Sequence, residues 1–141
     1  MYDTILLPTD GSEAAADAAV HAFSHARRYD ATVHVLSVVE LSSGLGLADR
    51  DSEKVEQLRA ERAGAAEELV EGANDGTADV EITVEVGSPA RVITDYAARI
   101  GADLAVMSTH ARSGAGRFLF GSVTERVIQD SNTPVLAVQR E

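Results

Sequence analysis

The chain has 141 residues and a mass of 14.9 kDa, which suits a single domain spanning residues 1–141. Apolar residues make up 45% of it, enough to build a core, and the absence of cysteine excludes disulfide scaffolds, thiolate metal sites and a cysteine nucleophile. Acidic residues outnumber basic ones by 23 to 12, and the net charge of −11 disfavours binding to DNA or RNA.

Apolar runs and helical periodicities alternate along the chain. The continuous apolar run 5–7 is typical of a strand buried on both faces, whereas 80–86 alternates apolar and charged residues and is expected near a sheet edge. Gly87-Ser88-Pro89 combines a turn glycine, a capping serine and a proline suited to the first helical position. In chain order the sequence predicts a strand at 4–7, a helix capped by Ser12, a strand at 32–39, a helix with the stripe Val55, Leu58, Arg62, Ala65 and Leu69, a strand at 80–86, a helix at 89–100, a strand at 103–107, a helix starting near Gly121-Ser122 and a strand at 135–138.

Strands that alternate with helices pair in parallel through right-handed crossovers, so the predicted fold class is α/β, a three-layer sandwich with a five-stranded parallel sheet. Such sheets bind ligands at the carboxyl ends of their strands, where the strand order reverses. If the first strand is central, the candidate rim consists of Pro8-Thr9-Asp10, Val38-Val39-Glu40 and Met107-Ser108-Thr109-His110. The last strand is either an ordinary buried strand or an exposed edge that pairs with a second copy in a homodimer.

The segment 107–124 leaves a buried strand, crosses a loop rich in small residues and enters a helix at Gly121-Ser122. From 108 to 124 it contains two bases, Arg112 and Arg117, and no acid. Small side chains let backbone N–H groups approach an anion, and a helix N-terminus adds unpaired donors and partial positive charge. The segment therefore predicts a phosphate site, although a flexible connection with a routine serine cap fits the same residues.

The sequence resembles the universal stress protein family over nearly its whole length. The resemblance lies in the opening 5–12, the Gly87-Ser88-Pro89 turn, the strand 103–107 and its loop, Gly121 to Val127, and the closing 134–138. It implies a Rossmann-like fold of the adenine nucleotide alpha hydrolase type, a dimer formed through the last strand, and ATP binding with Mg²⁺ in a regulatory or protective stress response.

ATP-binding members of that family carry glycine, two residues, glycine, nine residues, then glycine and serine or threonine. The last pair is Gly121-Ser122 here, but Ser108 and Ala111 stand where the two earlier glycines belong. The resemblance implies that Pro8, Thr9 and Asp10 line the nucleoside, with Asp10 near the ribose or Mg²⁺, and that backbone groups of Val38 meet adenine. The phosphates would be held by Ser108, Thr109, His110, Ala111, Arg112, Ser113 and Gly114, and by Gly121, Ser122, Val123 and Thr124.

Alternatives remain for single residues and for the whole chain. Asp10 could equally initiate a helix as part of an Asx turn. His110 stands where a catalytic base could lie, but it has no serine or cysteine nucleophile tied to it in sequence, and a lone histidine is more often structural. At most slow ATP hydrolysis is expected, because no lysine stands in the loop and no dedicated base is evident. A nucleotide-free dimeric interaction module and a true nucleotide hydrolase are the competing functions.

The location of the protein follows from what the sequence lacks. No apolar run approaches the roughly 20 residues of a membrane span, and the N-terminal residues lack the basic flank of a signal peptide. A cytoplasmic protein without membrane contact is expected. Its acid-rich, lysine-poor composition suits either a high-salt cytoplasm or an ordinary soluble acidic protein.

Overall fold

Strands and helices alternate through the described part of the chain, as the sequence predicts. The computed structural model describes residues 2–10, 13–40, 53–109 and 120–139. Among these residues the elements are β1 (Thr4–Thr9), α1 (Glu13–Tyr29), β2 (Thr32–Glu40), α2 (Glu53–Ala73), β3 (Val80–Gly87), α3 (Pro89–Ile100), β4 (Leu104–Ser108), α4 (Phe120–Asp130) and β5 (Val135–Val138). Ser12, the predicted cap of α1, lies outside the described residues.

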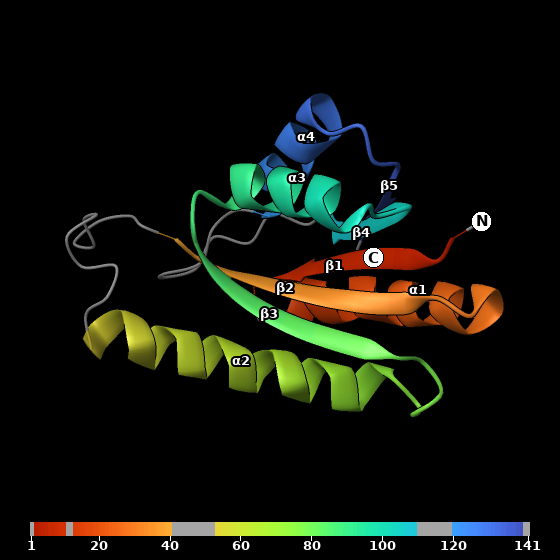
Figure 1. The fold of residues 1–141 in the computed structure, drawn as a ribbon, viewed down its shortest axis with the longest axis horizontal. Helices are drawn as coiled ribbons and strands as arrows, with labels where there is room; N and C mark the ends of the chain where they lie inside the picture. The colour runs from red at the N-terminus through yellow and green to blue at the C-terminus, as the bar shows by residue number, and fades with distance from the viewer. Residues whose placement is uncertain (1, 11–12, 41–52, 110–119, 140–141) are drawn as a thin grey trace.

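The five strands form one parallel sheet in the order β3-β2-β1-β4-β5. The chain moves from β1 outward to β2 and β3, then crosses back to β4 and β5 on the other side of β1 (Figure 1). This confirms the predicted fold class and the central position of β1. It also confirms that β3 lies at an edge, with β5 at the opposite edge.

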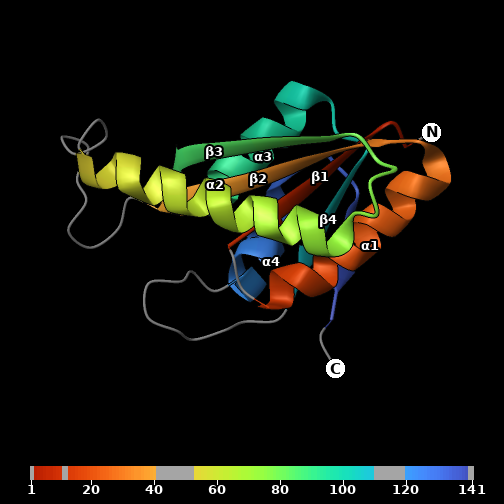
Figure 2. The same ribbon diagram turned by 90° about the horizontal axis from the view of Figure 1, so that it is seen from below.

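Two helices cover each face of the sheet. α1 and α2 pack on one face around a core that includes Phe23, Ile5 and Leu7, whereas α3 and α4 pack on the other around Leu6 and Ile93 (Figure 2). Successive side chains of a strand point to opposite faces, so the apolar run in β1 supplies both cores. All five of these side chains are fully buried.

The start of α3 differs in one respect from its prediction. Ser88 has the extended N-cap backbone conformation (φ −81°, ψ 122°), but its side chain makes no capping hydrogen bond, so this part of the prediction is wrong. Pro89 supplies the start instead, because its ring holds φ near the helical value and it has no N–H to satisfy. Gly87, two residues before Pro89, has φ +156°, and an added Cβ at this position would lie 2.9 Å from Cγ2 of Val92. The turn into α3 therefore requires glycine at this position.

Candidate functional site

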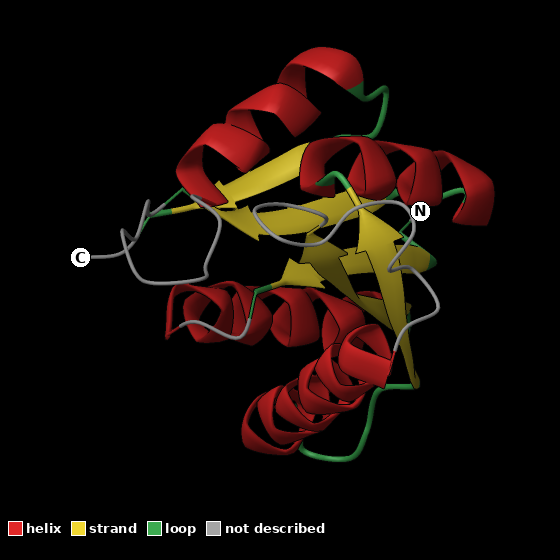
Figure 3. Ribbon diagram, turned by 90° about the vertical axis from the view of Figure 1, so that its left-hand side faces the viewer, coloured by secondary structure: helices red, strands yellow, loops and turns green. Residues whose placement is uncertain are grey.

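The carboxyl ends of β1, β2 and β4 meet where the strand order reverses, and we call this place the switch point. Figure 3 looks onto these strand ends, with α3 and α4 above the sheet and α1 and α2 below it. In open parallel sheets, ligands bind outside the carboxyl ends of the strands at such a reversal. The backbone groups that face the switch point can be assigned from the hydrogen bonds of the sheet.

β1 and β4 are paired over only a short length. Their register pairs are Ile5 with Leu104 and Leu6 with Ala105. The backbone groups of successive residues in a strand face its two neighbouring strands alternately. The carbonyl of Asp3 accepts from the N–H of Thr32 at 3.0 Å, so the odd-numbered residues of β1 face β2 and the even-numbered residues face β4. Pro8 therefore faces β4 without an N–H to donate, which explains why the ladder stops before the strand ends.

β2 continues past the end of β1. The last register pair between them is Thr9 with Ser37. The N–H of Thr32 donates toward β1 (3.0 Å) and that of Val33 toward β3 (2.9 Å), so the even-numbered residues of β2 face β1. The carbonyl of Val38 therefore points into the space beyond Thr9, at the switch point.

Arg62, on α2, donates a hydrogen bond to that carbonyl. Its Nη1 donates to the Val38 oxygen at 3.2 Å, and the arginine is half-buried. The guanidinium reaches the strand end from the face of the sheet that α1 and α2 cover, because α2 packs there through Ala66 and Leu69. A cationic donor thus stands where the resemblance places the adenine base.

On the β4 side, the corresponding carbonyl is that of Ser108. The N–H groups of Ala105 and Thr109 donate to β5 carbonyls, each at 2.9 Å, so the odd-numbered residues of β4 face β5 and Ser108 faces β1. The Thr124 hydroxyl of α4 donates to the Ser108 carbonyl at 2.7 Å, and both residues are almost completely buried. This bond holds the beginning of α4 against the end of β4.

The two carbonyls that face the end of β1 are therefore both hydrogen-bonded by side chains, from helices on opposite faces of the sheet. Arg62 reaches Val38 from α2, and Thr124 reaches Ser108 from α4. A carbonyl oxygen carries partial negative charge and repels an anion unless a donor satisfies it. The arrangement makes the switch point suitable for an anionic ligand.

Ser108 replaces a glycine of the family's ATP-binding motif without backbone strain. Among the described non-glycine residues, only Asp30 has a positive φ. Ser108 is the last residue of β4 and has ordinary extended backbone, so its side chain has no steric conflict with the chain path. Ala111, the second replacement, lies outside the described residues.

Asp10 follows β1 directly and brings a carboxylate to the switch point. Asp10 and Thr9 are each 3% exposed, so the carboxylate lies within the protein rather than on its surface. Within the described ranges, no group of three or more His, Asp or Glu side chains forms a metal cluster. One carboxylate suits Mg²⁺ only when phosphate oxygens and waters supply the other ligands, so the residues present fit a metal that arrives with a nucleotide.

The remaining predicted residues divide into three groups. Thr109 is engaged with β5, because its N–H and its hydroxyl both donate to the Val138 carbonyl, at 2.9 and 3.3 Å. In the first turns of α4, which begins one residue before Gly121, Ser122 is exposed and Val123 packs into the core beneath α3 and α4. Outside the described residues lie His110, Ala111, Arg112, Ser113 and Gly114.

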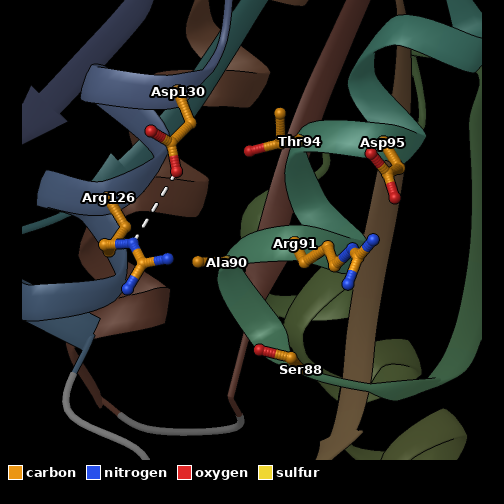
Figure 4. A pocket seen from close by; sticks show the side chains of 7 residues that line it. All are labelled: Ser88, Ala90, Arg91, Thr94, Asp95, Arg126 and Asp130. Atoms are coloured by element: carbon orange, nitrogen blue, oxygen red, sulfur yellow. Dashed lines mark ion pairs between the residues drawn. The ribbon is translucent and has the colours of Figure 1, made fainter.

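A cavity of about 510 Å³ lies between α3 and α4. Figure 4 shows Arg126 and Asp130 on α4, joined by an ion pair of 3.7 Å, across from Arg91 and Asp95 on α3. Two arginines and two aspartates leave these four side chains without net charge. Thr94 also lines the cavity, and its buried hydroxyl has no hydrogen-bond partner. The sequence analysis assigned no ligand-binding role to any of these residues.

Arg62 is the residue of the switch point that sequence reasoning missed. It was placed on the apolar stripe of the helix at 53–73, where a charged residue among Leu58, Ala65 and Leu69 is out of place. That anomaly was the available signal. Its partner, Val38, lies 24 positions earlier, so the contact required the packing of α2 on the sheet.

The comparisons with known proteins agree with the fold. A model of the universal stress protein family matches residues 1–139. A universal stress protein from Methanocaldococcus jannaschii is 36% identical over 142 residues, which cover 99% of this chain and 84% of that protein. The structure of the universal stress protein UspA from Lactobacillus plantarum is similar with a TM-score of 0.76 and 28% identity, over 97% of each chain.

A further similar structure contains a nucleotide. It is a universal stress protein in complex with cAMP, 25% identical, with a TM-score of 0.66 over 98% of this chain and 97% of that one. In the described part of this chain, no helix is both long and apolar enough to cross a membrane. The family match, the identity to a curated relative and the five-stranded parallel sheet lead to one conclusion: the chain belongs to the universal stress protein family.

Proposed function

We propose that this protein binds ATP together with Mg²⁺ at the switch point, and that the nucleotide acts as a regulatory ligand in a protective stress response in the cytoplasm. The observation that carries this proposal is the hydrogen bond from Thr124 to the Ser108 carbonyl, which holds the beginning of α4 at the end of β4. The N-terminus of a helix favours phosphate groups through its free N–H donors and its dipole. The cAMP complex of a similar protein supports a nucleotide at this fold.

The residues around the switch point suit the parts of a nucleotide in order. Phosphates lie at the start of α4, with Ser122 as a hydroxyl donor, and the nucleoside extends from there across the end of β1. Asp10 accepts hydrogen bonds from the ribose or joins Mg²⁺, which when bound neutralises phosphate charge. The base then meets the end of β2 at Val38. Pro8 and Thr9 line the nucleoside, and the segment 108–114 completes the phosphate site.

Hydrolysis is expected to be slow at most. The single lysine of the chain, Lys54, lies exposed on α2, so no lysine stands in the phosphate segment 108–124. Without a lysine in that segment or a dedicated base, stabilisation of a phosphoryl-transfer transition state is expected to be weak.

Calorimetric titration with Mg-ATP and thermal unfolding at matched salt concentration test the binding proposal. A free Mg-ATP concentration of about 100 times Kd is expected to add about 2.7 kcal/mol to the free energy of unfolding. Asp10→Asn is expected to weaken binding, whereas Asp95→Asn, which removes an exposed carboxylate on α3, is the matched control and leaves it unchanged. No heat and no stabilisation up to millimolar ATP would instead support the nucleotide-free interaction module. Sustained phosphate release that Asp10→Asn abolishes would support the hydrolase.

We also propose a homodimer formed through β5. This strand is at a sheet edge, Val135 and Leu136 are half-buried in the single chain, and Ala137 is exposed. An edge strand of this kind pairs readily with its own copy across a twofold axis. Sedimentation equilibrium is expected to give about twice the 14.9 kDa mass of the chain, and Ala137→Lys is expected to lower it. A wild-type mass of one chain would contradict the dimer.

A further inference from the structure

The cavity between α3 and α4 is lined by polar groups from both helices. In Figure 4 the hydroxyl of Thr94 points from α3 toward α4, where Arg126 and Asp130 are paired at 3.7 Å. The side chains of Arg91 and Asp95 extend to the other side of α3. The volume of the cavity, about 510 Å³, is within the range of small-molecule sites.

The hydroxyl of Thr94 is the observation that indicates a ligand. Its oxygen is buried, and no hydrogen-bond partner for it lies among the described residues. A buried polar group without a partner destabilises the folded state, whereas valine would fill the same volume without that penalty. A ligand in the cavity that presents a hydroxyl group would supply the missing hydrogen bond.

The start of α3 offers donors at the other end of the cavity. The first hydrogen bond of the helix runs from the N–H of Val92 to the Ser88 carbonyl at 2.9 Å, so the N–H groups of Ala90 and Arg91 precede the helical ladder. Ser88 adds a hydroxyl that makes no capping bond, and the first turn contains no acidic residue. These donors and the helix dipole favour a phosphate group.

Arg126 supplies a cation opposite this helix start. Its guanidinium lies level with Ala90 in Figure 4, and 69% of its side chain is exposed. Because the ion pair with Asp130 is exposed, it contributes little to stability, and Arg126 can exchange it for a phosphate group. Asp130 is then available to accept a hydrogen bond from a hydroxyl group of the same ligand.

We propose that the cavity between α3 and α4 binds a small phosphorylated polyol, with its phosphate between Arg126 and the start of α3 and a hydroxyl group at Thr94. The helix rises by about 6 Å from Ala90 to Thr94, so the phosphate and that hydroxyl group are separated by a similar distance. Glycerol 3-phosphate is a molecule of this size. The site is separate from the proposed nucleotide site, because it uses α3 and the later turns of α4.

NMR titration of the full chain with glycerol 3-phosphate, at constant ionic strength, tests this proposal. The amide signals of Ala90, Arg91 and Thr94 are expected to shift, with a Kd of about 1 mM or below. Arg126→Met and Thr94→Val are each expected to weaken binding about five- to tenfold. Arg28→Met is the control: this exposed arginine lies in the last turn of α1, on the other face of the sheet, and its loss is expected to leave the affinity unchanged.

Inorganic phosphate separates the two ends of the site. It is expected to shift the amides of Ala90 and Arg91, and Thr94→Val is expected to leave its affinity unchanged, since phosphate alone does not span the cavity. Thr94→Val is also expected to have a higher Tm than the wild type, because the substitution removes the unpartnered hydroxyl. The Tm measurement therefore shows that weaker binding in this variant is not caused by a loss of folding.

Weakened binding of glycerol 3-phosphate in both Arg126→Met and Thr94→Val, but not in Arg28→Met, supports the site. An unchanged affinity in either of the first two variants overturns it. The site is also overturned if no α3 amide shifts up to about 10 mM glycerol 3-phosphate, or if the shifts are confined to Gly121 and Ser122 at the start of α4. None of these outcomes decides whether ATP binds at the switch point, which has its own titration.

Discussion

Replacing Thr124 by valine tests whether its hydroxyl ties α4 to the end of β4. Valine has nearly the same shape, so the change removes the 2.7 Å hydrogen bond to the Ser108 carbonyl while keeping the packing. Thr124 is 1% exposed and Ser108 0%, so water cannot readily replace the lost donor. A buried acceptor that loses its donor costs about 1–3 kcal/mol in the free energy of unfolding. For a chain of 141 residues this lowers Tm by about 3 °C per kcal/mol.

Thr124→Ser is the matched variant, because it keeps the hydroxyl and removes only a methyl group. Urea denaturation of both variants separates the contribution of the hydrogen bond from that of the side-chain packing, and Mg-ATP affinity is measured on the folded proteins. We expect Thr124→Val to be the less stable of the two and to bind ATP about tenfold more weakly, since α4 no longer starts in a fixed position. If Thr124→Val is as stable as the wild type and Thr124→Ser is the destabilised variant, then packing and not the hydrogen bond holds α4, and the reasoning fails.

Two further predictions concern positions away from the switch point. Gly87→Ala should destabilise the protein by about 1–3 kcal/mol in urea denaturation, because the new Cβ would lie 2.9 Å from Cγ2 of Val92. Gly64→Ala is the control: this glycine is in the middle of α2, an added Cβ would meet nothing within 4 Å, and the change should stabilise the protein by about 0.5–1 kcal/mol. Equal effects of the two substitutions would contradict the account of the turn before α3. The Thr77 hydroxyl donates to the Asp75 carboxylate at 2.6 Å and holds the pKa of that carboxyl below its ordinary value of 3.8. This hydrogen bond therefore stabilises the folded protein fully at pH values above 3.8, and the stabilisation is lost as pH falls through the lower pKa of the folded state. Thr77→Ala should raise the pKa of Asp75 in an NMR titration, and an unchanged pKa would show that the hydroxyl is not its cause.

Much of the fold could be predicted because its signals are local. The apolar run in β1 indicated a strand buried on both faces, and its side chains do supply both cores. Pro89 marked the start of α3, and Gly101 marked its end, where it adopts the left-handed conformation (φ 64°) that glycine tolerates. Where the local signal was ambiguous the prediction failed, as for the Ser88 side chain, because a proline at the next position already supplies the helix start.

The candidate site was predictable only in outline. The alternation of strands and helices places the ends of β1, β2 and β4 together, so Thr9, Asp10 and Ser108 could be named from the order of elements alone. The roles of individual groups could not. Thr124 was expected to face phosphates, yet its hydroxyl donates to the Ser108 carbonyl, and its direct contact with phosphate stays a prediction.

Residue patterns along the chain were sufficient for the elements, the parallel sheet and the family, because each depends on neighbours within a few positions or on the order of segments. The two side-chain contacts that shape the switch point join residues 24 and 16 positions apart. Such contacts arise when helices on opposite faces of the sheet dock at particular heights along the strands. Docking is the sum of many packing interactions, so only the three-dimensional structure brought Arg62 to Val38 and Thr124 to Ser108.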